Sequence, residues 1–163
     1  MKKALLFFSF FLLLISNSIS SEIVIVDINF LLKNSNKGKL VQKELDNLSS
    51  KNSKKFQEKK KLLETEEKKI ASKKNILSKE DFNKEVLSFR QKVEKYEIER
   101  RKSSQEINNI KLKKVSKLLE EINKILLEYS TKNSISTVID KKNIIITKEE
   151  NDITKAILKI LDS

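Results

Sequence analysis

The chain of 163 residues contains no cysteine, histidine, proline or tryptophan, and it has a single glycine. Without cysteine no disulfide can form, and the lipid-bearing cysteine of a lipoprotein is also absent. Without histidine or cysteine there is no Ser-His-Asp triad, no Cys-His pair and no ordinary zinc site. A single glycine cannot build the glycine-rich loops that bind nucleotide phosphates. We therefore expect no catalytic residues, no cofactor, no metal ion and no use of ATP.

Carboxylate pairs are the remaining candidates for acid–base chemistry. Glu64, Glu66 and Glu67 lie among lysines at the spacing of a helix surface, which is typical of a solvated face. The sequence therefore predicts a protein that is not an enzyme.

The charge is strongly basic, with a formal net charge of +12 at pH 7. Such a charge favours nucleic acid, anionic lipid or acidic polypeptides as partners. Of the cationic residues 32 are lysine and three are arginine (Arg90, Arg100 and Arg101). Specific contacts with phosphates and bases favour the planar guanidinium, so this surface indicates diffuse attraction. The abundance of Lys, Asn, Ile and Ser also indicates an AT-rich coding bias.

The first twenty residues have the pattern of a secretory signal peptide. Lys2 and Lys3 precede an apolar run over residues 4–15, and Ser18 and Ser20 supply the small residues before a cleavage site. The alternative is an uncleaved membrane anchor, but the run is much shorter than the roughly 20 residues that span a bilayer. We expect cleavage after Ser20 and a soluble periplasmic product, a single domain over residues 21–163.

Short β-branched runs lie near both ends of this product. The sequence predicts strands at residues 22–27, 135–140 and 144–147, the last two forming a hairpin, and a helix capped by Asp152. A sheet this small has open apolar edges, so we expect an oligomer whose strands are pooled in a common body formed by residues 21–37 and 131–163. The predicted oligomerisation core consists of Ile23, Val24, Ile25, Val26, Val138, Ile139, Ile144 and Ile145.

Residues 38–130 carry apolar side chains at coiled-coil spacing and contain no proline. The single glycine, Gly38, stands at the start of this stretch, and we expect a left-handed turn there. The sequence predicts two antiparallel helices reversing near 77–79, with Ser78 capping the second; one continuous helix is the alternative. Folding there brings Ile70 near Val86 and Phe56 near Arg100. The predicted arm seam consists of Phe56, Leu63, Ile70, Leu77, Phe82, Val86, Phe89 and Val93. The seam positions that alternate with these on the first helix are polar (Asn52, Lys59, Glu66 and Lys73). Half of the seam is therefore missing, and we expect a marginal, flexible arm.

The fold class predicted from these elements is α+β, a small β-body with a long helical-hairpin arm. Its terminal blocks resemble the Skp/OmpH family of periplasmic chaperones. The resemblance rests on Ile23–Asp27 with Leu31-Leu32, on Ser35–Lys39 with Gln42–Leu45, and on Val138–Lys141, Ile144–Ile146, Asp152–Thr154 and Ile157-Leu158. The arms match in pattern only.

The resemblance implies a homotrimer whose three arms enclose a cavity. There the family holds unfolded outer-membrane β-barrel proteins without ATP and passes them on for assembly. Contact with anionic lipid or lipopolysaccharide is suggested for the family and stays open here. Apolar residues off the seam are the candidates for client contact: Leu62, Leu87 and Ile98. The alternatives are a structural coiled-coil spacer of the cell envelope and a non-specific basic nucleic-acid-binding protein.

Overall fold

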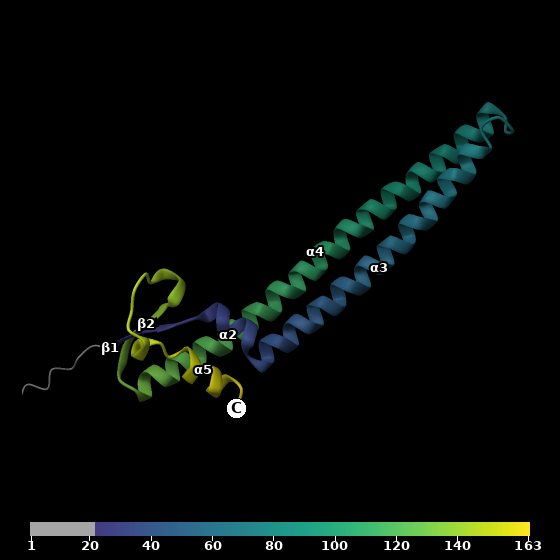
Figure 1. Cartoon of the computed structure of the whole chain (residues 1–163). Coiled ribbons are helices and arrows are strands. Elements are labelled where there is room, and N and C mark those ends of the chain that lie inside the picture. Colours follow the sequence, from purple (N-terminus) through teal and green to yellow (C-terminus); the bar gives the residue numbers. More distant parts are fainter. Residues whose placement is uncertain (1–21) are drawn as a thin grey trace, which may run out of the picture.

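The computed structural model describes residues 22–163, so the predicted signal peptide lies outside the described residues. A small body carries one long helical hairpin that projects from it (Figure 1). Strand β1 (Glu22–Val26) and helix α2 (Ile28–Asn34) lead into α3 (Asn36–Ser72), the outgoing helix of the arm. The returning helix is α4 (Lys79–Lys132). Strand β2 (Ile135–Asp140), the 3-10 helices η1 (Lys141–Asn143) and η2 (Glu149–Asn151), and helix α5 (Thr154–Leu161) complete the body.

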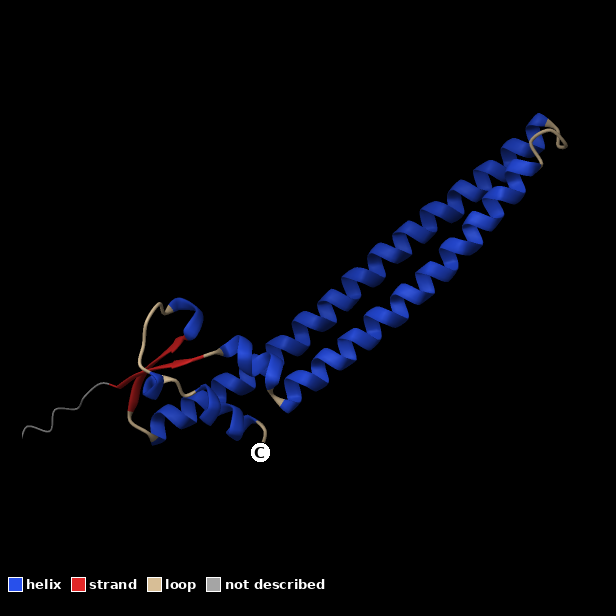
Figure 2. Ribbon diagram, in the orientation of Figure 1, coloured by secondary structure: helices blue, strands red, loops and turns tan. Residues whose placement is uncertain are grey.

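Strands β1 and β2 pair in parallel and form a two-stranded sheet at the base of the arm (Figure 2). Val24 lies opposite Val138 and Ile25 opposite Ile139. Parallel strands need a crossover connection, and here the entire hairpin arm serves as that connection. The predicted α+β class, with strands from both ends of the described chain and a long helical hairpin between them, is confirmed.

The hydrophobic core lies in the body, where α2, the C-terminal part of α4 and α5 pack against the sheet. Helix α4 contributes a stripe at helical spacing, and α5 presents residues at positions i, i+4 and i+8 of one face. The core is formed by Val24, Val26, Leu31, Leu118, Ile122, Leu126, Ile153, Ile157 and Leu161. Because α4 supplies residues to both the core and the arm, the direction of the arm is set by the packing of the body.

Polar contacts tie both ends of the chain to the base of the arm. The Asp27 carboxylate accepts a hydrogen bond from the Phe30 amide and caps α2. Asp162 accepts one from the Asn36 amide at the start of α3, over 2.8 Å. Asp152 lies before α5 rather than at its N-cap, which is Ile153, although its carboxylate still accepts from the Thr154 amide. Burial opposes the charge of Asp152, but hydrogen bonds from Lys141 and Thr154 outweigh it and hold its pKa below the usual range.

The predicted strand at 144–147 is absent from the described chain. After β2 the backbone enters η1, and residues 144–148 form an irregular connection in which Ile145 is 99% exposed and Ile146 87% exposed. The outer edge of β1 is instead occupied by Asp152, whose neighbour Ile153 donates its amide to the Ile25 carbonyl. Among residues 22–163 the run at 144–147 pairs with neither strand, and the outer edge of β2 has no strand beside it, so the predicted hairpin was wrong.

Gly38 was expected to form a left-handed turn, but it lies inside the first turn of α3 without a positive φ. A Cβ atom at this position would lie 2.0 Å from the Leu32 carbonyl oxygen and 2.9 Å from Ser35 Oγ. Ser35 is the N-cap of α3, and its hydroxyl accepts the Gly38 amide. Glycine is therefore required at this position, because the backbone of α3 lies against the backbone of α2 and leaves no space for a Cβ atom.

The reversal of the hairpin lies slightly earlier and is longer than predicted. Helix α3 ends at Ser72, so Leu77 belongs to the connecting segment, and α4 begins after Ser78. Ser78 Oγ accepts the Asp81 amide and donates to the Asp81 carboxylate, which confirms the predicted cap. The chain therefore forms two helices with a connection before Ser78, and the alternative of one continuous helix is wrong.

We predict that Gly38→Ala destabilises the protein by about 1–3 kcal/mol, because backbone atoms of Leu32 cannot move away as a side chain would. Urea denaturation followed by circular dichroism measures this loss. The matched control is Asn36→Ala two residues earlier, which keeps the backbone amide bond to Asp162. Equal unfolding midpoints for the two variants would contradict the close-approach explanation.

Candidate functional site

The arm is the candidate functional site, because it projects from the body as a long hairpin (Figure 1). Across residues 22–163 we find no helix long and apolar enough to cross a membrane. The arm carries its charges on the outside and an interface of apolar and paired polar residues between α3 and α4.

A ladder of ion pairs connects the two arm helices. Lys59–Glu99, Glu66–Lys92 and Lys73–Glu85 follow one another in steps of seven residues, upward on α3 and downward on α4. Lys37–Glu121 and Glu44–Lys114 continue the same register near the body. Asn52 accepts a hydrogen bond from the Ser103 hydroxyl at 2.6 Å. The polar seam positions are therefore partnered across the hairpin, and the interpretation that half of the seam is missing was wrong.

These pairs specify register more than they add stability. Their side chains are about one-third to one-half exposed, and exposed ion pairs contribute roughly 0–1 kcal/mol each. The hydrogen bond from the Lys59 ammonium lowers the pKa of Glu99 from its ordinary value. Sliding one helix against the other would separate every pair at once, so the ladder selects one alignment of α3 and α4.

The apolar contacts follow the predicted seam. Phe56 packs edge-on against Tyr96, with ring centroids 5.8 Å apart. Arg100 pairs with Glu97 on its own helix, and the cations over the Phe56 ring are the ammonium groups of Lys55 and Lys59. Phe56 and Ile70 are buried, while Leu63, Phe82, Val86, Phe89 and Val93 are only partly covered.

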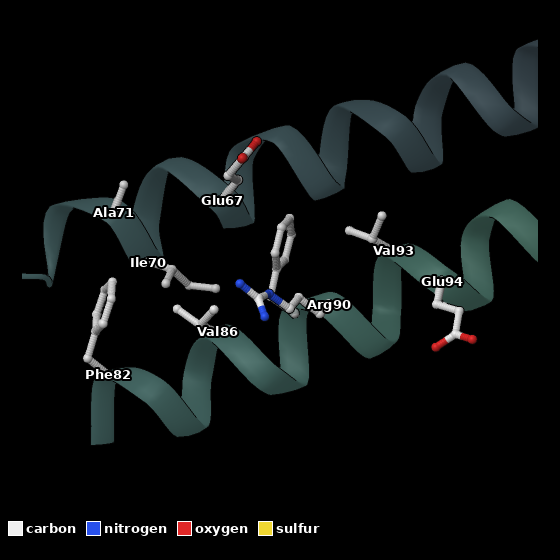
Figure 3. Close-up of a pocket in the computed structure, with 9 residues that line it drawn as sticks. Glu67, Ile70, Ala71, Phe82, Val86, Arg90, Val93 and Glu94 are labelled. Carbon is white, nitrogen blue, oxygen red and sulfur yellow. The ribbon is translucent and has the colours of Figure 1, made fainter. Parts of the chain in front are cut away.

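The partly covered seam residues line an open groove near the tip of the arm (Figure 3). Ile70 and Val86 face each other across it, as the predicted fold-back requires. The groove has a volume of about 560 Å³ and is lined by Glu67, Ile70, Ala71, Phe82, Val86, Phe89, Arg90, Val93 and Glu94. The sequence assigned Ile70, Phe82, Val86, Phe89 and Val93 to the seam, but Ala71 and the charged residues of the groove were missed. Their helical spacing relative to the seam was the available signal.

The three predicted client-contact residues are exposed but lie apart. Leu62 is 71% exposed, Leu87 57% and Ile98 38%. Leu62 borders the ion-pair ladder together with Lys59 and Glu66. None of the three lines the groove at the tip.

The predicted oligomerisation core divides into two sets. Val24, Ile25 and Val26 are at most 3% exposed within the single chain. Val138, Ile139 and Ile144 are half-buried, whereas Ile23 is 52% exposed and Ile145 99% exposed. The first set forms part of the chain's own core, and the second leaves apolar surface uncovered on the body.

Comparison with known proteins identifies the family. The sequence profile of the outer membrane proteins described as OmpH-like matches residues 22–161, which cover both the body and the arm. The chain belongs to the OmpH-like family. Membership supports a chaperone role for this OmpH-like protein, as the resemblance of its terminal blocks suggested. A search of curated proteins finds no match.

A solved structure shares the fold of this OmpH-like chain. It is the crystal structure of a candidate outer membrane chaperone (OmpH-like) from Caulobacter crescentus CB15, with a TM-score of 0.80 at 18% sequence identity. The alignment covers 86% of this chain and 83% of the other. At this identity the likeness concerns the arrangement of body and arm.

We predict that Glu66→Lys destabilises the arm by up to about 1 kcal/mol, because it places a like charge against Lys92. The double exchange Glu66→Lys with Lys92→Glu should recover most of this loss, and the difference should shrink in high salt. Thermal unfolding of both variants at two salt concentrations measures it. A double exchange no more stable than the single variant would argue against the pairing.

Proposed function

We propose that the chain is an ATP-independent holdase of the periplasm. In this proposal it binds unfolded outer-membrane β-barrel proteins between the helical arms of a homotrimer and delivers them for outer-membrane assembly. The match of the OmpH-like profile over residues 22–161, on a chain whose body projects one long hairpin, carries the proposal. It requires no catalytic residue, cofactor or metal ion.

Trimer formation is supported by the apolar surface that a single body leaves uncovered. Ile145 and Ile146 are almost fully exposed in an irregular segment next to β2. A groove of about 550 Å³ lies between α4 and the sheet, and Leu126, Leu127, Ile135 and Val138 are among its lining residues. Large uncovered apolar surface on a body this small favours assembly. In the proposed trimer, residues 144–147 of one protomer take the β conformation against a neighbour, and the strand absent from the single chain then forms.

Client holding is supported by the chemistry of the arm. Lysines along α3 and α4 attract acidic segments of an unfolded chain through a field that salt screens. Exposed apolar side chains, Leu62, Leu87 and Ile98 among them, are available for weak contacts. Many weak contacts on three tethered arms raise the overall avidity without a deep pocket.

The holdase proposal predicts that the mature protein prevents aggregation of a urea-unfolded outer-membrane β-barrel after dilution, with no nucleotide present. Light scattering follows aggregation, and a soluble cytoplasmic protein of equal charge serves as the control for basic charge alone. Scattering that stays unchanged at several-fold excess of the assembled protein would refute the proposal. A spacer or a nucleic-acid-binding protein would give that result.

The trimer proposal predicts that Ile145→Asp converts the assembly to monomers of unchanged helix content, because Ile145 makes little contact within its own chain. Mass photometry or light scattering measures the mass. Leu87→Asp, an equally polar change at a 57% exposed leucine of α4, is the control and should remain assembled. A monomeric wild-type protein, or a trimeric Ile145→Asp variant, would show that this segment does not form the interface.

A further inference from the structure

The two flanks of the arm are chemically different. On α4, the ladder residues Glu85, Lys92 and Glu99 are seven residues apart. Each residue turns a helix by about 100°, so successive ladder residues differ by only about 20° and lie on one side of the helix. Val86 and Val93 follow Glu85 and Lys92 by one residue, so they lie on the opposite shoulder of the same interface. On α3, Glu67 stands in the same relation to Glu66. The ion-pair ladder therefore closes one flank, and the other flank is the apolar groove near the tip.

The groove is an apolar floor with a charged rim (Figure 3). Ile70, Phe82, Val86, Phe89 and Val93 provide the floor, and the last four keep part of their surface accessible. The volume of about 560 Å³ falls within the range of about 300–1,000 Å³ that is typical of binding pockets. The groove can therefore accept more than one side chain.

The charged groups at the rim have no partner among residues 22–163. Glu67, Arg90 and Glu94 make no ion pair or side-chain hydrogen bond with any described residue, unlike Glu66 and Lys92 on the other flank. Two carboxylates and one guanidinium thus offer both acceptors and donors around an apolar floor. This combination suits an uncharged, hydrogen-bonding occupant better than an ion of either sign.

We propose that this groove binds an extended segment of an unfolded outer-membrane β-barrel by its aromatic and aliphatic side chains. The inference rests on the proposed function and assigns it a site. The strands of such barrels alternate apolar and polar residues and carry aromatic girdles. In an extended segment the apolar side chains all lie on one face, and they enter between Phe82, Phe89 and Val93. The polar side chains face water.

The rim supplies what the backbone of such a segment lacks. An unfolded strand has unpaired N–H and C=O groups, which are costly to bury unless they are hydrogen-bonded. Glu67 and Glu94 accept from N–H groups, and the Arg90 guanidinium donates to carbonyl oxygens. Leu87, on the outer side of α4, is no part of this site.

The test uses the full mature protein and a peptide of about ten residues in which tyrosine and phenylalanine alternate with serine and threonine. Its partner peptide has serine in place of each aromatic residue. Ala71→Phe fills the groove from its exposed lip, and Ser72→Phe adds the same ring one residue along, outside the groove. Fluorescence anisotropy measures peptide binding, and the light-scattering assay is run on the same variants.

Ala71→Phe should weaken the affinity for the aromatic peptide about tenfold, because it excludes about one apolar side chain of the peptide from the groove. Ser72→Phe should leave the affinity unchanged. Val86→Thr keeps the shape of the floor but replaces one methyl group with a hydroxyl, and we expect about a fourfold loss of affinity. Val115→Thr, at a half-buried valine nearer the body, should cause none. Circular dichroism and mass measurements on every variant check whether it folds and assembles like the wild type.

The failures of the site and of the function are distinguishable. Wild-type protein that suppresses aggregation, together with Ala71→Phe that binds the peptide normally, overturns the groove and leaves the holdase function standing. Equal binding of the serine peptide also overturns it, because the aromatic side chains would then contribute nothing to the affinity. A changed mass of Ala71→Phe would assign the groove to contacts between copies of this chain. No suppression by wild type rejects the function itself.

Discussion

The parallel pairing of β1 with β2 is the constraint on which the remaining structure depends. It joins residues more than a hundred positions apart, Val24 with Val138 and Ile25 with Ile139, and so requires the intervening chain to leave the body and return to it. Leu31, Ile122 and Ile157 close over the sheet and are completely buried. If this base were loose, the arm would have no fixed direction, because α4 runs from the arm into the core of the body.

The arm shows how a largely polar interface can still be specific. Exposed Lys–Glu pairs each contribute little free energy, but their seven-residue repeat on both helices leaves a single alignment in which all of them form. Apolar residues such as Phe56 and Ile70 supply the burial. This division leaves one flank closed by charges and the other open and apolar, and a surface of that kind suits weak, repeated contact with an unfolded chain.

The sequence predicted the architecture well where the signal was periodic or local. The heptads, the Ser78 cap and the β-branched runs at 22–27 and 135–140 all appear as expected, because each depends on residues near one another in the chain. Prediction failed where a distant neighbour decides. The run at 144–147 has strand propensity, yet it does not pair with β2 within the described chain. Glycine is needed at position 38 because a Cβ atom there would collide with the Leu32 carbonyl oxygen, and not because of its own dihedral angles. Lys59 and Glu66 looked like gaps in the seam because their partners lie 40 and 26 residues away.

The sequence by itself determined the kind of protein: a basic chain without histidine or cysteine, with a hairpin arm between β-forming ends and the terminal blocks of the OmpH-like family. Composition and periodicity are properties of the chain alone and need no partner. Only the tertiary structure decided which flank of the arm carries the ion pairs and which the groove. That outcome depends on how α3 and α4 are rotated against each other, and the rotation is set by contacts between residues far apart in sequence.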